Sequence, residues 1–186
     1  MNKQSPGKAD TVKLLDGSVI SVRRLGKRDI EAVIELHKQL TDREQYMRFF
    51  VVHPAYLQAF AEKVTERDGS HCALGAFDSG RLIGVANYVV PNQQDVAEVA
   101  VAVAHKDHLR GVATALLRRL ADIALSNGIH RFTADVLAEN AAMLKVLSDA
   151  GWRHTTHFDG SVLNIRIDLS DLAAQAADQS ATSPAR

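Results

Sequence analysis

The spacing of apolar residues changes between a strand period and a helix period several times along the chain. Residues 95–103 form a short, β-branched apolar run, which predicts a buried strand. After Gly111 the apolar residues of the segment 112–123 recur at helical spacing, with charged residues on the other faces. Residues 130–136 predict another strand, and residues 139–150 predict a helix that stops at a glycine.

The rest of the chain continues this alternation and predicts a mixed β-sheet. Before residue 95 we expect a strand, three helical segments and a hairpin, and after residue 152 a last pair of strands. The predicted fold is therefore α/β of the α+β type, with helices on both faces of one central sheet. The expected segments are strands 18–25, 72–77, 82–90, 153–158 and 161–169, a helix from 29 to 39 capped by Asp29, and helical stretches 41–50 and 54–66.

Composition favours one domain with untethered ends. The chain has 186 residues, of which 46% are hydrophobic and 24% charged, enough for one sizeable core. Residues 1–10 and 173–186 lack an apolar period, so we expect disordered tails around a domain of residues 11–172. We expect a monomer or a homodimer.

Charge and cysteine content exclude several classes of protein. The formal net charge is zero, so the sequence indicates no nucleic-acid surface and no attraction to an acidic membrane. No apolar run is long enough to cross a bilayer, and the polar N-terminus does not resemble a signal peptide. The single cysteine, Cys72, has no partner for an internal disulfide, and we expect a cytoplasmic protein.

The turn between the strand 95–103 and the following helix is a candidate anion site. A helix leaves its first N–H groups without internal partners, and its dipole places partial positive charge there, so a diphosphate fits this position. Gly111 permits close approach, and Arg110 is expected to add a mobile cation. The turn lacks the sequence motifs that bind nucleoside triphosphates and dinucleotides, which argues against ATP and NAD as ligands. We call residues 108–114 the phosphate loop: His108, Leu109, Arg110, Gly111, Val112, Ala113 and Thr114.

These elements, in this order, resemble the acetyl-CoA-binding half of the GNAT superfamily of N-acetyltransferases. The run from Arg110 to Thr114 matches the second half of that family's diphosphate motif, although His108 stands where Gln or Arg is usual and Leu109 replaces a frequent glycine. A second signature, an Asn followed eleven residues later by Gly and an aromatic, is met by Asn140 and residues 151–152. The motifs span residues 95–152, and the wider resemblance covers residues 17–169.

The resemblance implies a binding mode for acetyl-CoA as cosubstrate. Two parallel strands, ending near Val103 and Val136, would diverge, and the pantetheine arm would run between them. Backbone groups of Val101 and Val103 would bind this arm. Asn140 would add a polar contact to it, although an Asn at this position also commonly caps a helix.

Glu98 is the candidate general base. A free lysine is neutral in only about one molecule in several thousand at pH 7, so the reaction needs a group that removes a proton. Period-two counting places Glu98 on the same strand face as Ala100 and Ala102, whose small side chains leave room for a substrate. The resemblance implies the same role, because bacterial protein-lysine acetyltransferases carry a base Glu on the corresponding strand. The alternative is a structural ion pair with a buried Arg or Lys.

The expected acceptor is a protein lysine, attacked directly in a ternary complex. Residues 46–50 resemble the aromatic-rich segment of the bacterial protein-lysine subgroup, here without an appended regulatory domain. A small-molecule amine acetyltransferase and a non-catalytic acyl-CoA sensor remain as alternatives. Leu147 occupies the position where many members place a Tyr acid, which leaves the general acid open.

A metal site is not expected from the histidines. His105 and His108 are close in sequence, as are His154 and His157, but neither pair has the helical spacing with a third ligand that is typical of such sites. His108 is instead expected to act as a donor in the phosphate loop.

Overall fold

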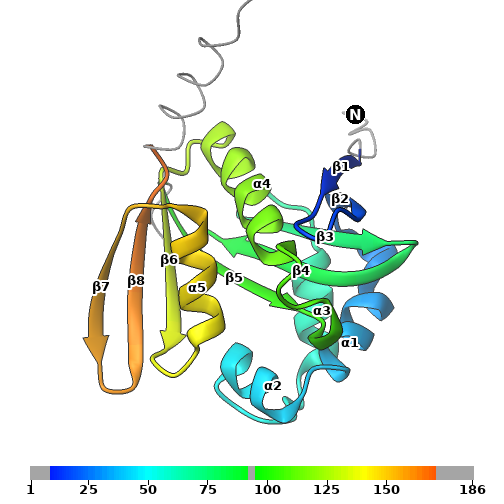
Figure 1. Ribbon diagram of the computed structural model, residues 1–186, viewed down its shortest axis with the longest axis horizontal. Coiled ribbons are helices and arrows are strands. Elements are labelled where there is room, and N and C mark those ends of the chain that lie inside the picture. Colours follow the sequence, from blue (N-terminus) through cyan, green and yellow to red (C-terminus); the bar gives the residue numbers. More distant parts are fainter. Residues whose placement is uncertain (1–8, 92–94, 171–186) are drawn as a thin grey trace, which may run out of the picture.

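The computed structural model describes residues 9–91 and 95–170. Its centre is an eight-stranded mixed sheet with the strand order β1-β2-β3-β4-β5-β6-β8-β7 (Figure 1). The strands are β1 Asp10–Lys13, β2 Val19–Arg24, β3 His71–Asp78, β4 Arg81–Val89, β5 Val96–Val103, β6 Arg131–Leu137, β7 His154–Asp159 and β8 Val162–Asp168. The helices are α1 Ile30–Lys38, α2 Asp42–Phe49, α3 Leu57–Thr65, α4 Val112–Ser126 and α5 Ala141–Ala150, with short 3-10 helices η1 Lys27–Asp29 and η2 His105–Asp107.

Helices cover both faces of the sheet, as the sequence predicts. In Figure 1 α4 and α5 lie on one face, and α1 and α3 lie on the other. Buried residues form one cluster around α4, which includes Leu116 and Phe132, and a second cluster beneath α1 and α3, which includes Val33 and Ala102. The predicted single α/β domain with a mixed sheet is confirmed.

β5 and β6 are the parallel neighbours in this sheet, and they part soon after they meet. Their register runs only from the pair Val96–Arg131 to the pair Glu98–Thr133. β5 then continues to Val103 and β6 to Leu137 without further pairing to each other. The predicted splayed strand pair is therefore present, and backbone groups on these two strand ends are left for other partners.

Two local expectations are corrected by the structure. β1 was not predicted, and it begins at Asp10, so this residue belongs to the sheet rather than to the expected tail. Asp29 precedes α1, but its carboxylate does not cap that helix, because it accepts hydrogen bonds from the Gly26 amide (3.0 Å) and from Arg23. The expected tails at residues 1–8 and 173–186 lie outside the described residues.

Within residues 9–91 and 95–170, none of the helices combines the length and the apolar character that crossing a bilayer requires.

Candidate active site

The phosphate loop has the predicted strand–turn–helix geometry. α4 begins at Val112 directly after Gly111, whose φ of 88° lies in the left-handed region that favours glycine. The first amide to find a carbonyl within the helix is that of Ala115, which donates to Gly111 (3.0 Å). Among the described residues the amides of residues 112–114 have no acceptor, so they are available to an anion at the positive end of the α4 dipole.

The loop is attached to the turn between β1 and β2, which the sequence did not indicate. The Leu15 amide donates to the Arg110 carbonyl (3.1 Å), and a Cβ at Gly111 would lie 3.1 Å from Cγ of Leu15. A side chain at position 111 would therefore combine an unfavourable backbone conformation with a tight contact.

Arg110 is not the mobile cation that the sequence suggested. Its guanidinium donates to Asp16 (2.7 Å), to Asp78 (3.0 Å) and, by a short contact, to Asp107. Asp107 is 3% exposed and also accepts from Arg81 (3.0 Å). The three carboxylates raise the pKa of Arg110 further above its usual range. This side chain fixes the shape of the loop, and any contact from Arg110 to a diphosphate stays a prediction.

The two residues where the loop departs from the family pattern behave differently. Leu109 has a φ of 62° and is 86% exposed, so it adopts the backbone conformation that the usual glycine would supply and leaves its side chain in solvent. His108 does not point to the free amides of α4, because its Nε2 lies 3.0 Å from the Val103 carbonyl oxygen. Its expected role as a diphosphate donor stays untested.

The backbone N–H and C=O groups of alternate residues in β5 face β6, on the side where the two strands diverge. The Ala104 amide donates to the Ile83 carbonyl on β4, and antiparallel pairing alternates along a strand. Backbone groups of Ala102 therefore face β4, whereas those of Val101 and Val103 face away from it, toward β6. These are the two residues expected to bind the pantetheine arm, although the Val103 carbonyl already contacts His108.

Glu98 is exposed and lies on the last residue pair that joins β5 to β6. Its side chain is on the same face as those of Ala100 and Ala102, as predicted, and Ala102 packs toward α1 and α3. Among the described residues Glu98 makes no ion pair within 4.0 Å, so the structural ion pair considered as the alternative is absent there. The carboxylate is placed where a molecule in solvent reaches it.

Arg48 is close enough to Glu98 to interact with it electrostatically, and sequence reasoning did not single it out. It comes from α2 and donates from Nη2 to Asn87 Oδ1 (3.2 Å), while its Nε is buried and lacks a partner among the described residues. The rings of Phe49 and Phe60 lie 5.0 and 5.2 Å from its guanidinium. Burial lowers the pKa of Arg48 to about 10, although the nearby charge of Glu98 opposes this shift. Arg48 therefore remains a cation at neutral pH and is close enough to interact electrostatically with Glu98.

The second family signature lies at the start of α5. Asn140 is the N-cap of α5, and its Oδ1 accepts from the Met143 amide (3.1 Å), so the capping role is present. The contact from Asn140 to a pantetheine arm stays a prediction. Leu147 is 1% exposed and belongs to the core, so its position supplies no acid.

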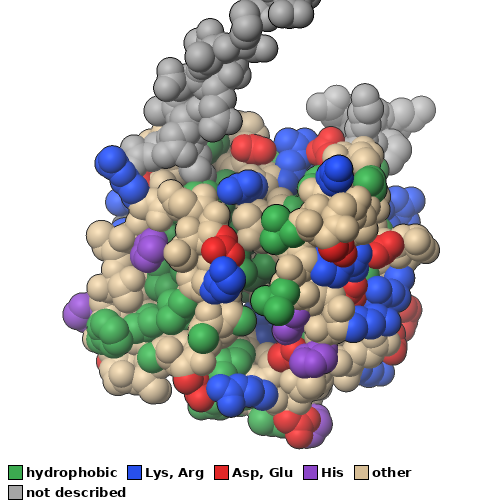
Figure 2. Space-filling model, in the orientation of Figure 1, with side chains coloured by type: hydrophobic (Ala, Val, Ile, Leu, Met, Phe, Trp, Pro, Cys, Tyr) green, Lys and Arg blue, Asp and Glu red, His purple; other side chains and the backbone are tan. Residues whose placement is uncertain are grey.

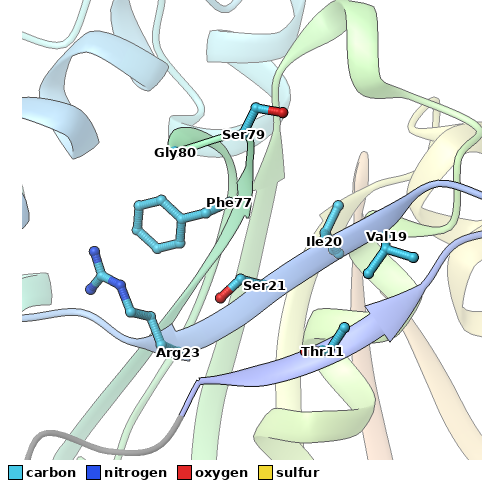
Figure 3. A pocket seen from close by; sticks show the side chains of 8 residues that line it. All are labelled: Thr11, Val19, Ile20, Ser21, Arg23, Phe77, Ser79 and Gly80. Carbon is cyan, nitrogen blue, oxygen red and sulfur yellow. The ribbon is translucent and has the colours of Figure 1, made fainter.

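A hollow and a pocket on the surface of the described residues differ in character. Figure 2 shows a narrow hollow near the centre of one face, where hydrophobic side chains lie deeper than the charged ones around them. A pocket of about 450 Å³ lies elsewhere, against β1, β2 and the β3–β4 turn (Figure 3). In this pocket Arg23 stacks on Phe77 at 4.0 Å and is already paired with Asp29. The pocket is remote from Glu98 and lacks an acidic lining residue, so it is not the predicted site.

Comparisons with known proteins agree with this geometry. The model of the acetyltransferase (GNAT) family matches residues 30–152. The GNAT domain of S. lividans PAT is 32% identical, with a TM-score of 0.79 over 86% of this chain and 96% of that domain. A cAMP-binding acyltransferase from Mycobacterium smegmatis is 23% identical, with a TM-score of 0.61 over 87% of this chain and 47% of that protein. M. smegmatis RimJ, in complex with CoA-disulfide, is 19% identical, with a TM-score of 0.69 over 90% of each chain.

The two M. smegmatis proteins are similar in fold alone, and this chain spans about half the length of the first of them. The family match covers well over half of the chain, and the S. lividans domain is matched almost along its whole length. The chain belongs to the GNAT family, whose members are acetyl-CoA-dependent N-acetyltransferases.

Proposed function

We propose that this chain transfers the acetyl group of acetyl-CoA to a lysine side chain of a protein, with Glu98 as the general base. The observation that carries the proposal is the exposed Glu98 carboxylate at the point where β5 parts from β6. An amine that approaches from solvent reaches this carboxylate beside the strand ends where an extended cosubstrate fits.

The cosubstrate would be held mainly by backbone groups. The free amides of residues 112–114 bind the diphosphate at the start of α4. Val101 and Val103, whose backbone groups face β6, bind the amide groups of the pantetheine arm as an added strand would. Asn140 can contribute its amide NH₂ group, because only its Oδ1 is used in capping α5.

The reaction would proceed by direct attack within a ternary complex. Glu98 removes a proton from the lysine ammonium, directly or through a water, and the neutral nitrogen attacks the thioester carbonyl carbon. A strand N–H near residues 99–101 stabilises the oxyanion of the tetrahedral intermediate. When the C–S bond breaks, coenzyme A leaves as a thiolate, and the second proton of the attacking nitrogen passes to this thiolate through water. The modest basicity of the thiolate makes a dedicated acid at position 147 unnecessary.

A protein acceptor is favoured over a small amine by the exposure of Glu98. An enzyme for polyamines needs an enclosed acidic pocket around its base, whereas the Glu98 carboxylate is exposed. The S. lividans domain, which is 32% identical, is part of a protein named PAT. We place the reaction in the cytoplasm, where the single buried Cys72 stays reduced.

The experiment is to incubate the protein with labelled acetyl-CoA and either cell proteins or spermidine, and to locate the label by mass spectrometry. Label on protein lysines that forms at least about a hundredfold more slowly when Glu98→Gln replaces the natural chain supports the proposal. Label found only on spermidine establishes the small-molecule alternative. Binding of acetyl-CoA without transfer to either acceptor establishes the sensor alternative.

A further inference from the structure

Three side chains that commonly ligate metals meet beside the phosphate loop. Glu44 comes from α2, whereas His105 and His108 follow β5. Oε1 of Glu44 lies 2.8 Å from Nδ1 of His105 and 3.3 Å from Nε2 of His108. All three candidate ligand atoms lie within 4.8 Å of one another. Figure 2 shows histidine side chains next to acidic ones on the face that carries the central hollow.

The carboxylate of this cluster is held in place by its second oxygen. Oε2 of Glu44 accepts from the Thr41 amide (2.8 Å) and from the Thr41 hydroxyl (2.9 Å) in the capping box of α2. Oε1 is therefore directed at the two histidines. Burial acts to raise the pKa of Glu44, but hydrogen bonds from Thr41 and His105 outweigh it and lower that pKa, so the carboxylate is ionised at neutral pH.

The two histidines are also carried by a fixed segment. The Ala104 amide is bonded to β4 (2.9 Å), and Asp107, at the end of η2, is buried between Arg81 and Arg110. His105 and His108 are themselves exposed, so solvent and ions reach their rings. A carboxylate and two imidazoles on supported elements form a partly preorganised ligand set.

We propose that Glu44, His105 and His108 bind a divalent ion of the zinc class. Two ligand atoms on a tetrahedral zinc, each about 2.0–2.2 Å from the metal, lie about 3.3–3.6 Å apart. The Glu44–His108 separation of 3.3 Å meets this range, whereas the Glu44–His105 separation of 2.8 Å has to widen by about half an ångström on binding. The exposed side of the cluster leaves the fourth position to water. Imidazole and carboxylate donors favour zinc over magnesium, which prefers oxygen ligands.

The ion would replace hydrogen bonds that now join the same atoms. Nε2 of His108 also lies 3.0 Å from the Val103 carbonyl oxygen, so it carries a proton in the absence of a metal. On binding, each imidazole takes the tautomer whose proton lies on its other ring nitrogen, and the freed nitrogen donates its lone pair to the ion. The bound ion then links α2, which carries Arg48, to the segment that leads into the phosphate loop.

The test is titration of the tag-free protein with zinc chloride, followed by isothermal calorimetry. We expect one ion per chain, and a loss of affinity of at least about tenfold in each of His105→Ala and His108→Ala. At about 100 times the dissociation constant, zinc should raise Tm by about 5–10 °C, whereas magnesium chloride should leave it unchanged. Cobalt(II) absorption in the visible range would report tetrahedral coordination.

The matched control is His157→Ala, which removes an exposed histidine from β7. It should bind zinc as the natural chain does. The proposal is overturned if the natural chain takes up no stoichiometric zinc, or if His157→Ala and His105→Ala reduce binding equally. The measurement uses no acetyl-CoA, so its outcome is independent of the proposed acetyl transfer.

Discussion

β5 carries two regions that differ in how their charges are held. At its carboxyl end the chain enters a segment in which Arg110 is bound by three carboxylates, one of them the buried Asp107. In the first half of the strand Glu98 is exposed and has no ion pair within 4.0 Å among the described residues. Its charge interacts with that of Arg48, which donates a hydrogen bond to Asn87.

The difference separates a binding region from a reacting region. Where the diphosphate is expected, carboxylates occupy the Arg110 guanidinium and fix the loop, so the free backbone amides at the start of α4 are left to attract the anion. Where the amine is expected, a carboxylate is left without a fixed partner and can accept a proton. The following predictions test this division, beginning with the largest expected effect.

Replacing the reacting carboxylate should abolish most of the activity without affecting cosubstrate binding. For Glu98→Gln we expect kcat to fall about 10²–10⁴-fold, because the amine loses its base, and the residual rate to rise with pH as free lysine deprotonates. The dissociation constant for acetyl-CoA should stay unchanged. Steady-state kinetics and calorimetry measure these quantities, with the exposed Glu139→Gln as control. Full activity of Glu98→Gln across the pH range would remove Glu98 from the mechanism.

Replacing the buried carboxylate should affect stability and binding together. In Asp107→Asn the hydrogen bonds from Arg81 and Arg110 lose their charged acceptor, so the free energy of unfolding should fall by about 1.5–3 kcal/mol. The loosened loop should also bind acetyl-CoA less tightly. Urea denaturation and calorimetry test both effects, and the exposed Asp122→Asn is the control. An unchanged urea midpoint would contradict the structural role assigned to Asp107.

Acid should weaken the attachment between the β1–β2 turn and the loop. Hydrogen bonds from Ser18 and Arg110 lower the pKa of Asp16 from 3.8 to about 2. Because the folded-state pKa is depressed, Asp16 stabilises the fold above about pH 4, and this contribution is lost as the pH falls toward 2. The difference in urea midpoint between the natural chain and Asp16→Asn should therefore shrink over that range. The control is Asp149→Asn, whose urea midpoint should differ less from that of the natural chain at every pH. A constant difference from pH 5 to pH 2 would refute this.

The smallest effect is expected where the loop departs from the family pattern. The left-handed conformation of Leu109 costs about 1–2 kcal/mol, and Leu109→Gly removes this cost. The glycine also increases the backbone entropy of the unfolded chain, which lowers the free energy of unfolding by about 0.5–1 kcal/mol. The net gain in unfolding free energy should be about 0–1.5 kcal/mol. Thermal unfolding measures it, with Leu109→Ala as the matched control. A similar loss of stability in both Leu109→Gly and Leu109→Ala would show instead that the exposed leucine side chain stabilises the loop.

Much of the architecture could be predicted because it depends on local periodicity. The apolar alternation of β5 and the helical spacing of α4 each identify their element without tertiary information. The short strand β1, with only four residues, gives too weak a period to be recognised. Asp29 was misassigned for a related reason, because the presence of Arg23 beside it depends on how β2 meets η1.

The parts of the site that were missed depend on long-range contacts. Arg110 meets Asp16 and Asp78 only because the β1–β2 and β3–β4 turns lie against the phosphate loop. Glu44 and His105 are separated by 61 positions in the sequence, and no spacing rule connects them. Arg48 was noted only within an aromatic-rich segment, and its approach to Glu98 follows from the position of α2 over β5.

The contacts between the β1–β2 turn and the phosphate loop limit how far the chain can be shortened without loss of stability. A fragment cut to the family match, residues 30–152, would lack Asp16, Ser18 and the amide of Leu15, all of which hold Arg110. Such a fragment would also lose β8, the neighbour of β6. Crystallisation and expression trials should therefore retain everything from Asp10 to Leu169, because the β1–β2 hairpin holds Arg110 and so stabilises the phosphate loop.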